Sequence, residues 1–270
     1  MPALDHSLIH PTALIGPDVV LAADVRVGTF AILDGAITLG TGCVVGPNVH
    51  LLGTVVAGVN NVFHSGCVIG DTPQHLGYAG EPTTVEIGAG NVFREFVTVH
   101  RGMPATGKTT IGDKNLFMVG SHVAHDCRVA NQCIFANSAV IGGHVEVSDG
   151  AFLSGNTAVH QFCRVGRLAM LSGTSAVSQD LPPFWIVQEV NIVHGVNVIG
   201  MRRAGIPNPE ILAIRRAFKL LNRSGLTIRA AVEQIETADG QLPAVRELIE
   251  FIRSSKRGIV TGRGTRGADD

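Results

Sequence analysis

A chain of 270 residues can form one large domain or one domain with an appendage. Charged residues make up only 16% of it, against about 25% in an average globular protein, and 33 residues are glycine. An unusually large share of the chain should therefore be buried. The formal net charge of -1 gives no reason to expect a nucleic-acid partner.

The N-terminal segment shows no recognisable targeting signal. Residues 1–11 include Asp5, His6 and His10 without the apolar core of a signal peptide, and about 18 apolar residues in a row occur nowhere. The five cysteines are odd in number and form no C-x-x-C pair, which indicates reduced thiols. We expect a cytoplasmic protein without membrane insertion.

A six-residue period dominates the sequence from Ile9 to about Pro182, with an apolar residue at almost every sixth position. Its runs extend from Ile9 to Ile69, from Ile87 to Val99 and from Ile111 to Val177. The fifth slot of each hexad is small or β-branched, and all the cysteines fall in it: Cys43, Cys67, Cys127, Cys133 and Cys163. Short strands joined by tight turns, three to a coil of about 18 residues, fit this period. The sequence thus predicts an all-β solenoid over residues 1–190.

Two stretches interrupt the period, residues 71–86 and residues 101–110. Neither supplies the apolar column that would point into the solenoid, so both should leave it as loops. Loops on a rigid scaffold are where binding groups usually gather.

From Ile206 the period of the sequence becomes helical. Three helices are predicted from their caps and stops: one opened by Asn208 and Pro209 and ended by Gly225, one from Thr227 to about Thr237, and one from Pro243 to Gly258. The sequence therefore predicts a C-terminal helical domain over residues 191–258. A flexible tail is expected over residues 259–270.

Residues 18 apart in such a solenoid lie one above another, so the sequence predicts which side chains share a corner. The columns are His125 with Gly143 and Gln161, Asp126 with His144 and Phe162, and Ala124 with Gly142 and His160, with His122 one step before. Four histidines and one carboxylate at a single corner indicate a functional site.

General base catalysis fits this cluster, because a neutral imidazole can take the proton of a hydroxyl as its oxygen attacks a carbonyl carbon. His125 is the predicted base. Asp126 would hold the imidazole tautomer, although His144 could lie nearer that carboxylate. The backbone N–H of Gly143 would donate to the tetrahedral oxyanion.

Other interpretations of the cluster stay open at this point. A lone histidine is more often structural than catalytic, and Cys127 could be a nucleophile, although its inward slot favours packing. The histidines could also bind zinc, as in carbonic anhydrases built on the same kind of helix, which need three histidine ligands and an open position. Those enzymes share an H-x-x-x-x-H pair, whereas His122 and His125 form H-x-x-H followed by Asp126.

Seven segments carry a resemblance over nearly the whole length. They are YAGEPTTVEIG at residues 78–88, VTVHRG at 97–102, SHVAHDC at 121–127, GGHV at 142–145, AVHQFCRVG at 158–166, QDLPPF at 179–184 and GVNVIGMRR at 195–203. In order and spacing they resemble the UDP-N-acetylglucosamine O-acyltransferases, which are hexapeptide-repeat acyltransferases. The resemblance implies a left-handed parallel β-helix with a small C-terminal α-helical domain. It also implies a homotrimer with each site between two subunits.

The activity implied by the resemblance is the transfer of a 3-hydroxyacyl group from acyl carrier protein to the 3-hydroxyl of UDP-N-acetylglucosamine, the first step of lipid A biosynthesis. The same catalytic residues are implied: His125, Asp126 and Gly143. The implied substrate-binding residues are His122, His144, His160 and Gln161, with Gln74, Asn197 and Arg203 reaching the nucleotide. No metal or cofactor is expected, and the acyl carrier protein thioester is the co-substrate.

Some positions modify these expectations. Gly173 falls where related enzymes limit the length of the acyl chain, and glycine there should admit a longer chain. Gly77 and Ile199 stand where the family often has a lysine and an acid, which alters the expected nucleotide contacts. Arg202 and Arg203 could instead be a solvated surface pair.

The first predicted C-terminal helix carries a cationic face that suits an acidic carrier protein. Its residues are Arg215, Arg216, Lys219 and Arg223. An ordinary solvated helix face is the alternative, and the resemblance favours the carrier protein. The nearest rival family, the N-acyltransferases of the same pathway, carries an extra domain before its hexads, whereas the repeats here begin at Ile9. That family therefore resembles this chain less, while the choice between a 3-hydroxyl and a 3-amino acceptor stays open at this point.

Overall fold

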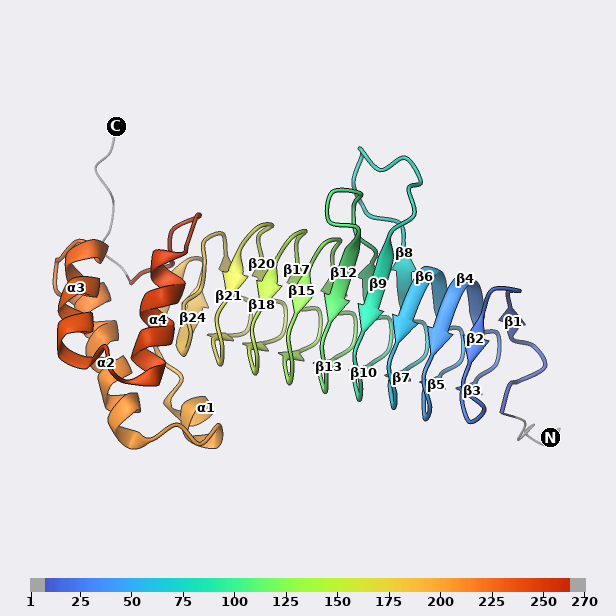
Figure 1. The fold of residues 1–270 in the computed structure, drawn as a ribbon, viewed down its shortest axis with the longest axis horizontal. Helices are drawn as coiled ribbons and strands as arrows, with labels where there is room; N and C mark the ends of the chain where they lie inside the picture. Colours follow the sequence, from blue (N-terminus) through green and yellow to red (C-terminus); the bar gives the residue numbers. More distant parts are fainter. Residues whose placement is uncertain (1–7, 263–270) are drawn as a thin grey trace.

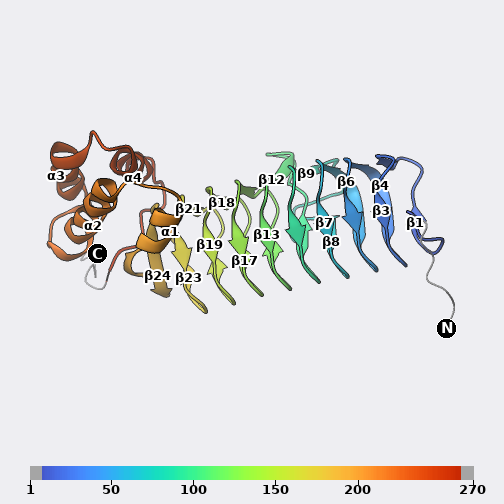
Figure 2. The ribbon, with the colours of Figure 1, turned by 90° about the horizontal axis from the view of Figure 1, so that it is seen from below.

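The computed structural model describes residues 8–262 and shows a long prism of parallel strands followed by helices (Figure 1). As predicted, the prism is a left-handed parallel β-helix. Seen from below, the helices lie at the C-terminal end of the prism and leave most of its length uncovered (Figure 2). Among residues 8–262, none of the helices is both long enough and apolar enough to cross a membrane.

The strands form two sheets that make the faces of the prism. The ten-stranded sheet contains β3 (Arg26–Val27), β5 (Val44–Val45), β7 (Val62–Phe63), β10 (Val92–Phe93), β13 (Leu116–Phe117), β16 (Ile134–Phe135), β19 (Phe152–Leu153), β22 (Met170–Leu171), β24 (Trp185–Glu189) and β25 (Ile192–Val196). The fifteen-stranded sheet covers two faces, because the long strands β4 (Ile32–Leu39) and β6 (His50–Ala57) run through a corner and pair on both. Its other members are β1 (Leu14–Ile15), β2 (Val20–Leu21), β8 (Val68–Asp71), β9 (Thr84–Ile87), β11 (Thr98–His100), β12 (Lys108–Ile111), β14 (His122–Val123), β15 (Arg128–Val129), β17 (Val140–Ile141), β18 (Glu146–Val147), β20 (Ala158–Val159), β21 (Arg164–Val165) and β23 (Ala176–Val177).

The interior of the prism is made by the apolar residue of each hexad, as the period predicts. Four of these residues form an aromatic column, Phe63, Phe93, Phe117 and Phe135, with successive ring centroids 5.0, 4.9 and 4.8 Å apart. The cysteines of the fifth slot are all buried and free. Truncating one of the stacked rings would leave a cavity and cost about 3–5 kcal/mol of stability.

The pairing register shows where the loops leave the prism. Most strands pair with a strand 18 residues on, as Phe117 does with Phe135. The interval grows to 30 between Val62 and Val92 and to 24 between Val92 and Leu116. The loops are shorter than predicted, since β9 begins at Thr84 and β12 at Lys108. Both strands are lengthened because they pair with each other over four residues, which a hexad count cannot anticipate.

The C-terminal segment begins with a hairpin that the sequence analysis did not predict. β24 and β25 pair antiparallel, so the sheet continues past residue 190 into the segment expected to be helical. The helices are α1 (Val198–Arg203), α2 (Asn208–Arg223), α3 (Ile228–Asp239) and α4 (Pro243–Arg253). α1 was not predicted, and α4 ends at Arg253 instead of Gly258.

The expected flexible tail over residues 259–270 is wrong for its first part. Ile259 and Val260 are buried, Asp180 bridges to Ile259, and Ile192 bridges to Thr261. The last coil has no further coil above it. The short segment therefore pairs with backbone groups at this end of the prism and covers apolar surface that would otherwise be exposed. Residues 263–270 lie outside the described residues.

Candidate active site

The predicted catalytic residues lie at one outer corner of the prism, where successive coils turn with the same backbone geometry. Asp126, His144 and Phe162 have φ of 63°, 60° and 64°. This left-handed conformation is uncommon for residues other than glycine, and it recurs here once per coil. The three side chains therefore form a column, in which the His144 and Phe162 rings stack with centroids 4.4 Å apart.

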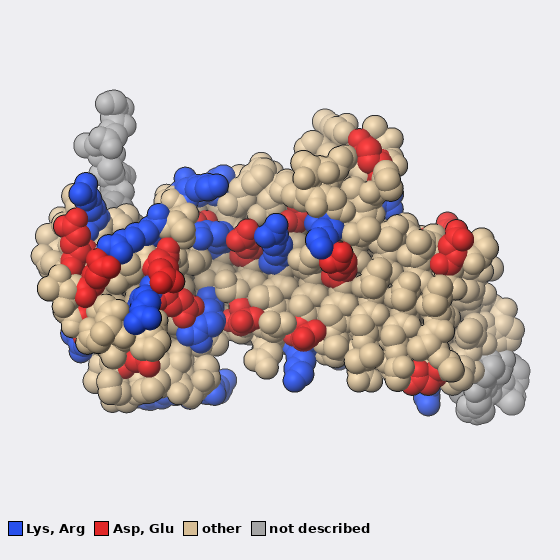
Figure 3. Space-filling view, viewed as in Figure 1, with Lys and Arg blue, Asp and Glu red and all other residues tan. Residues whose placement is uncertain are grey.

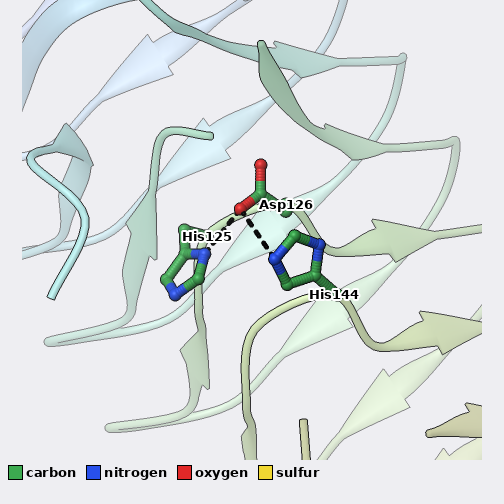
Figure 4. A group of neighbouring side chains, drawn as sticks. All are labelled: His125, Asp126 and His144. Atoms are coloured by element: carbon green, nitrogen blue, oxygen red, sulfur yellow. Dashed lines mark hydrogen bonds and ion pairs between the residues drawn. The ribbon is translucent and has the colours of Figure 1, made fainter. Parts of the chain in front are cut away.

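His125 and Asp126 form a hydrogen-bonded pair at this corner (Figure 4). His125 Nδ1 lies 2.6 Å from Asp126 Oδ2, and because a carboxylate only accepts hydrogen bonds, the imidazole Nδ1–H is the donor. In a neutral ring this leaves Nε2 as the free base. His144 Nε2 lies farther from the same oxygen, at 3.3 Å. One carboxylate therefore orients two imidazoles, and His125 is the nearer of them.

Gly143 lies directly against the His125 ring. A Cβ atom at Gly143 would be 2.6 Å from His125 Cε1 and 2.8 Å from Nε2, so only glycine fits with the ring in this position. Among residues 8–262, the backbone N–H of Gly143 donates to no acceptor. Gly143 thus contacts the ring of the proposed base and carries an unpaired N–H, and such a donor is suited to stabilise a developing oxyanion.

A shallow cleft of about 430 Å³ opens beside His125 and Gly143. Four predicted substrate-binding residues line it: Gln74, His122, His160 and Gln161. Gln74 comes from the first loop, between β8 and β9, whereas the other three come from the coils. The structure thus brings six of the predicted site residues to one surface.

His144 lies on the other side of Asp126 and lines a second cavity of about 480 Å³. Phe162 lines this cavity. It is also lined by Arg128, Glu146 and Arg164, which are paired in register on β15, β18 and β21. Figure 3 shows acidic and basic side chains mixed on this view of the molecule, mainly over its C-terminal half. The second cavity is therefore polar and carries charges of both signs.

Besides His144, three predicted binding residues lie outside the His125 cleft within one chain. The Asn197 side chain caps α1, where it accepts from Gly200 N–H and donates to the Leu168 carbonyl. Arg203 is exposed in the last turn of α1. Gly173 belongs to a different corner, at which a Cβ would lie 3.7 Å from the Gly155 carbonyl oxygen.

Two histidines that the sequence analysis missed also belong to this corner. The His75 ring of the first loop meets the His125 ring edge-on, with centroids 5.5 Å apart. The His100 ring meets that of His122 at 5.0 Å, and Thr98 Oγ1 lies 2.7 Å from His122 Nδ1. The 24-residue interval across the second loop could have revealed His100. Thr98 pairs with His122 instead of with a residue 18 positions on, and this register brings the nearby His100 to the same corner.

Burial favours the neutral form of three of the surrounding imidazoles, those of His100, His122 and His144. It lowers the pKa of His122 to about 4 and also lowers the pKa of His100. Burial lowers the pKa of His144 as well, although Asp126 opposes this shift. Burial raises the pKa of the Cys127 thiol to about 12, so this cysteine is a poor nucleophile and is explained by packing.

The same cluster can be tested as a metal site. One ligand atom each from His125, Asp126 and His144 lie within 4.8 Å of one another. Tetrahedral zinc, with bonds near 2.0–2.1 Å, separates its ligand atoms by roughly 3.3 Å. The 2.6 Å between His125 Nδ1 and Asp126 Oδ2 is the spacing of a hydrogen bond instead. In this conformation the donor set fits proton transfer better than metal ligation.

The cationic face of α2 is only partly available. Arg216 forms a two-pronged ion pair with Asp239 of α3, at 2.7 to 3.1 Å, an acid that is distant in sequence. The Arg223 guanidinium lies 5.9 Å from the centre of the Phe218 ring. Arg215 and Lys219 are exposed. The structure leaves these two as the freest cations of the predicted patch.

The left-handed prism of hexad coils, with a histidine–aspartate pair and a glycine N–H at an outer corner, defines the hexapeptide-repeat acyltransferase class. The family model of UDP-N-acetylglucosamine O-acyltransferase, domain 2, matches residues 180–260. The chain belongs to the UDP-N-acetylglucosamine acyltransferase family, as comparison with solved structures shows. The enzyme from Bacteroides fragilis is 37% identical, with 93% of this chain and 99% of that chain covered and a TM-score of 0.90. Those from Moraxella catarrhalis (35% identity, coverage 94% and 100%) and Francisella novicida (30%, coverage 95% and 95%) also give TM-scores of 0.90.

Proposed function

We propose that this protein transfers a 3-hydroxyacyl group from the thioester of an acyl carrier protein to the 3-hydroxyl of UDP-N-acetylglucosamine, the opening step of lipid A biosynthesis in the cytoplasm. The observation that carries the proposal is the 2.6 Å hydrogen bond that orients His125, beside Gly143, whose backbone N–H is unpaired among the described residues. Acyl transfer to an alcohol requires a base that can reach the attacking hydroxyl and a donor that can reach the carbonyl oxygen.

The proposed reaction begins when His125 Nε2 takes the proton of the sugar hydroxyl, whose oxygen then attacks the thioester carbonyl carbon. The carbonyl oxygen gains the negative charge and accepts a hydrogen bond from Gly143 N–H. Asp126 stabilises the imidazolium through Nδ1 without taking its proton. The tetrahedral intermediate collapses, the thiolate of the carrier leaves, and the proton held by His125 passes to that sulfur.

Substrate contacts are proposed for the residues that line the cleft and for His144, which lines the second cavity on the other side of Asp126. Asn197, Arg203 and Gly173 lie elsewhere on the chain, so in one chain they cannot complete the cleft. We infer a homotrimer in which a neighbouring copy supplies such residues to the site. Sedimentation tests this inference, and a stable monomer at micromolar concentration that retains full activity would exclude it.

The experiment for the proposed function combines the purified protein with UDP-N-acetylglucosamine and a panel of 3-hydroxyacyl carrier proteins, followed by the mass of the product. A product heavier by one 3-hydroxyacyl group is expected, and longer chains should be accepted if Gly173 opens the acyl pocket. His125→Ala should lose about 10²-fold or more in turnover with the fold intact. Equal turnover in the wild type and His125→Ala would exclude His125 as the base.

Two rival activities are separated by the same preparation. An acceptor with a 3-amino group in place of the 3-hydroxyl tests for N-acyl transfer, which the matched O-acyltransferase family model disfavours. Elemental analysis tests for zinc. Stoichiometric zinc with hydratase activity would replace the proposed reaction, whereas we expect turnover to survive chelation because no step above uses a metal or cofactor.

A further inference from the structure

The second loop of the prism, residues 101–107, folds back onto the carboxylate of Asp126. Its turn is closed by the hydrogen bond from Gly107 N–H to the Met103 carbonyl, at 2.8 Å. From this turn the N–H of Met103 donates to Asp126 Oδ1 at 2.8 Å, and the hydroxyl of Thr106 donates to the same oxygen. An exposed loop thus contacts a carboxylate whose side chain is completely shielded from solvent.

These contacts give the two carboxylate oxygens separate roles. Oδ1 accepts from the loop, while Oδ2 accepts from His125 Nδ1 at 2.6 Å and lies 3.3 Å from His144 Nε2. The backbone N–H of Asp126 is also held, by a 2.8 Å hydrogen bond to Thr109 Oγ1. Rotation of the carboxylate would break hydrogen bonds to a charged group, which are among the stronger ones in proteins. Oδ2 therefore stays aimed at the imidazoles.

We propose that Thr106 is a positioning residue for the acyl transfer, acting through Asp126 on the orientation of His125. This inference rests on the proposed function, because it assigns the loop a part in the same proton transfer. Thr106 touches neither the sugar nor the acyl group in this role. Its hydroxyl fixes the carboxylate, and the carboxylate fixes the imidazole.

A purely structural relation would run in the other direction, with Asp126 holding the loop in place. Removing the Thr106 hydroxyl would then loosen the loop and leave the reaction of bound substrates unchanged, apart from a change in KM. Positioning predicts a loss in kcat with little change in KM, because the orientation of His125 matters when the proton moves. The hydroxyl group itself, and not the size of the side chain, should carry the effect.

The test compares Thr106→Val, Thr106→Ser and the matched control Thr110→Val in the full-length protein with UDP-N-acetylglucosamine and a 3-hydroxyacyl carrier protein. Thr110 lies on β12, and among residues 8–262 its hydroxyl makes no hydrogen bond. We expect Thr106→Val to lower kcat about 10-fold with KM within about twofold. Thr106→Ser should restore most of the rate, and Thr110→Val should match the wild type.

An NMR measurement complements the comparison of kcat and KM. In protein labelled with ¹⁵N-histidine, the proton shared between His125 Nδ1 and Asp126 should change its chemical shift in Thr106→Val, and should keep it in Thr106→Ser and Thr110→Val. Thermal unfolding verifies that each variant is folded, and Thr106→Ala replaces the valine variant if it is not. An unchanged kcat, an effect on KM alone, or equal losses with serine and valine would overturn the positioning role.

His125→Ala, assayed beside these variants, distinguishes a failure of the positioning role of Thr106 from a failure of the proposed function. If His125→Ala is inactive while Thr106→Val behaves as the wild type, only the positioning role of Thr106 falls. If His125→Ala keeps full turnover, the proposed base is wrong and the role of Thr106 falls with it. The proposed base and the positioning role are both supported if His125→Ala is inactive, Thr106→Val loses kcat with little change in KM, and Thr106→Ser restores most of the rate.

Discussion

Gly143→Ala is the sharpest test of the proposed site, because it moves the base without removing the oxyanion donor. The new Cβ would lie 2.6 Å from His125 Cε1, whereas ordinary contact begins at 3.4 Å. The ring must retreat by about 0.8 Å, since carbon atoms repel strongly below their contact distance. A displacement near 1 Å in a reacting group can cost about 10²-fold in rate, so we expect kcat to fall by that order.

The assay is turnover of UDP-N-acetylglucosamine with 3-hydroxyacyl carrier protein, together with thermal unfolding. Gly195→Ala is the matched control, because a Cβ atom added at Gly195 would have no atom within 4 Å beyond those of its chain neighbours, and it should keep the wild-type rate. Gly143→Ala should remain folded, since the clash is with the end of a side chain that can shift. A Gly143→Ala variant with wild-type kcat would refute the placement of the base beside this glycine.

Three further outcomes are expected. Alkylation of the native protein with iodoacetamide should leave activity intact, because burial raises the pKa of the Cys127 thiol to about 12, and inactivation by modification of Cys127 would contradict this. Burial lowers the pKa of His122 to about 4, so between about pH 6.5 and pH 4 the unfolded chain binds a proton that the folded chain does not. The free energy of unfolding should therefore fall as the pH drops through that window, by about 2 kcal/mol from this group at pH 4.5, and His122→Gln should show a weaker pH dependence in urea titrations. Arg215→Glu with Lys219→Glu should raise the KM for the acyl carrier protein about tenfold at low salt and less at high salt, and an unchanged KM would exclude the α2 patch as its docking surface.

Most of the fold could be predicted from the six-residue period of the sequence. Each hexad places an apolar residue inward and a small residue near the turn, so the solenoid, the two loops and the buried cysteine slot could all be predicted from spacing alone. The ends of the elements could not. β9 and β12 lengthen because they pair with each other, and β25 forms because β24 offers it an edge. Such pairings join segments whose local sequences carry no sign of the partner.

The same limit applies to the charged and polar contacts. The column rule placed Asp126 beneath His144 and His125 beneath Gly143, because stacking follows directly from the coil length. Only the structure decided that His125 is the imidazole nearer Asp126, and that Asp239 pairs with Arg216. These outcomes depend on side-chain rotamers and on how separate helices pack.

The sequence by itself determined a repetitive scaffold and the corner at which its histidines meet, since a fixed period translates into vertical stacking. Tertiary structure alone decided which loop residues return to that corner. Met103 and Thr106 reach Asp126, and His75 reaches His125, because each loop leaves the period and its path is set by contacts in space. A period predicts only what repeats, and the hydrogen bonds that orient the site do not repeat.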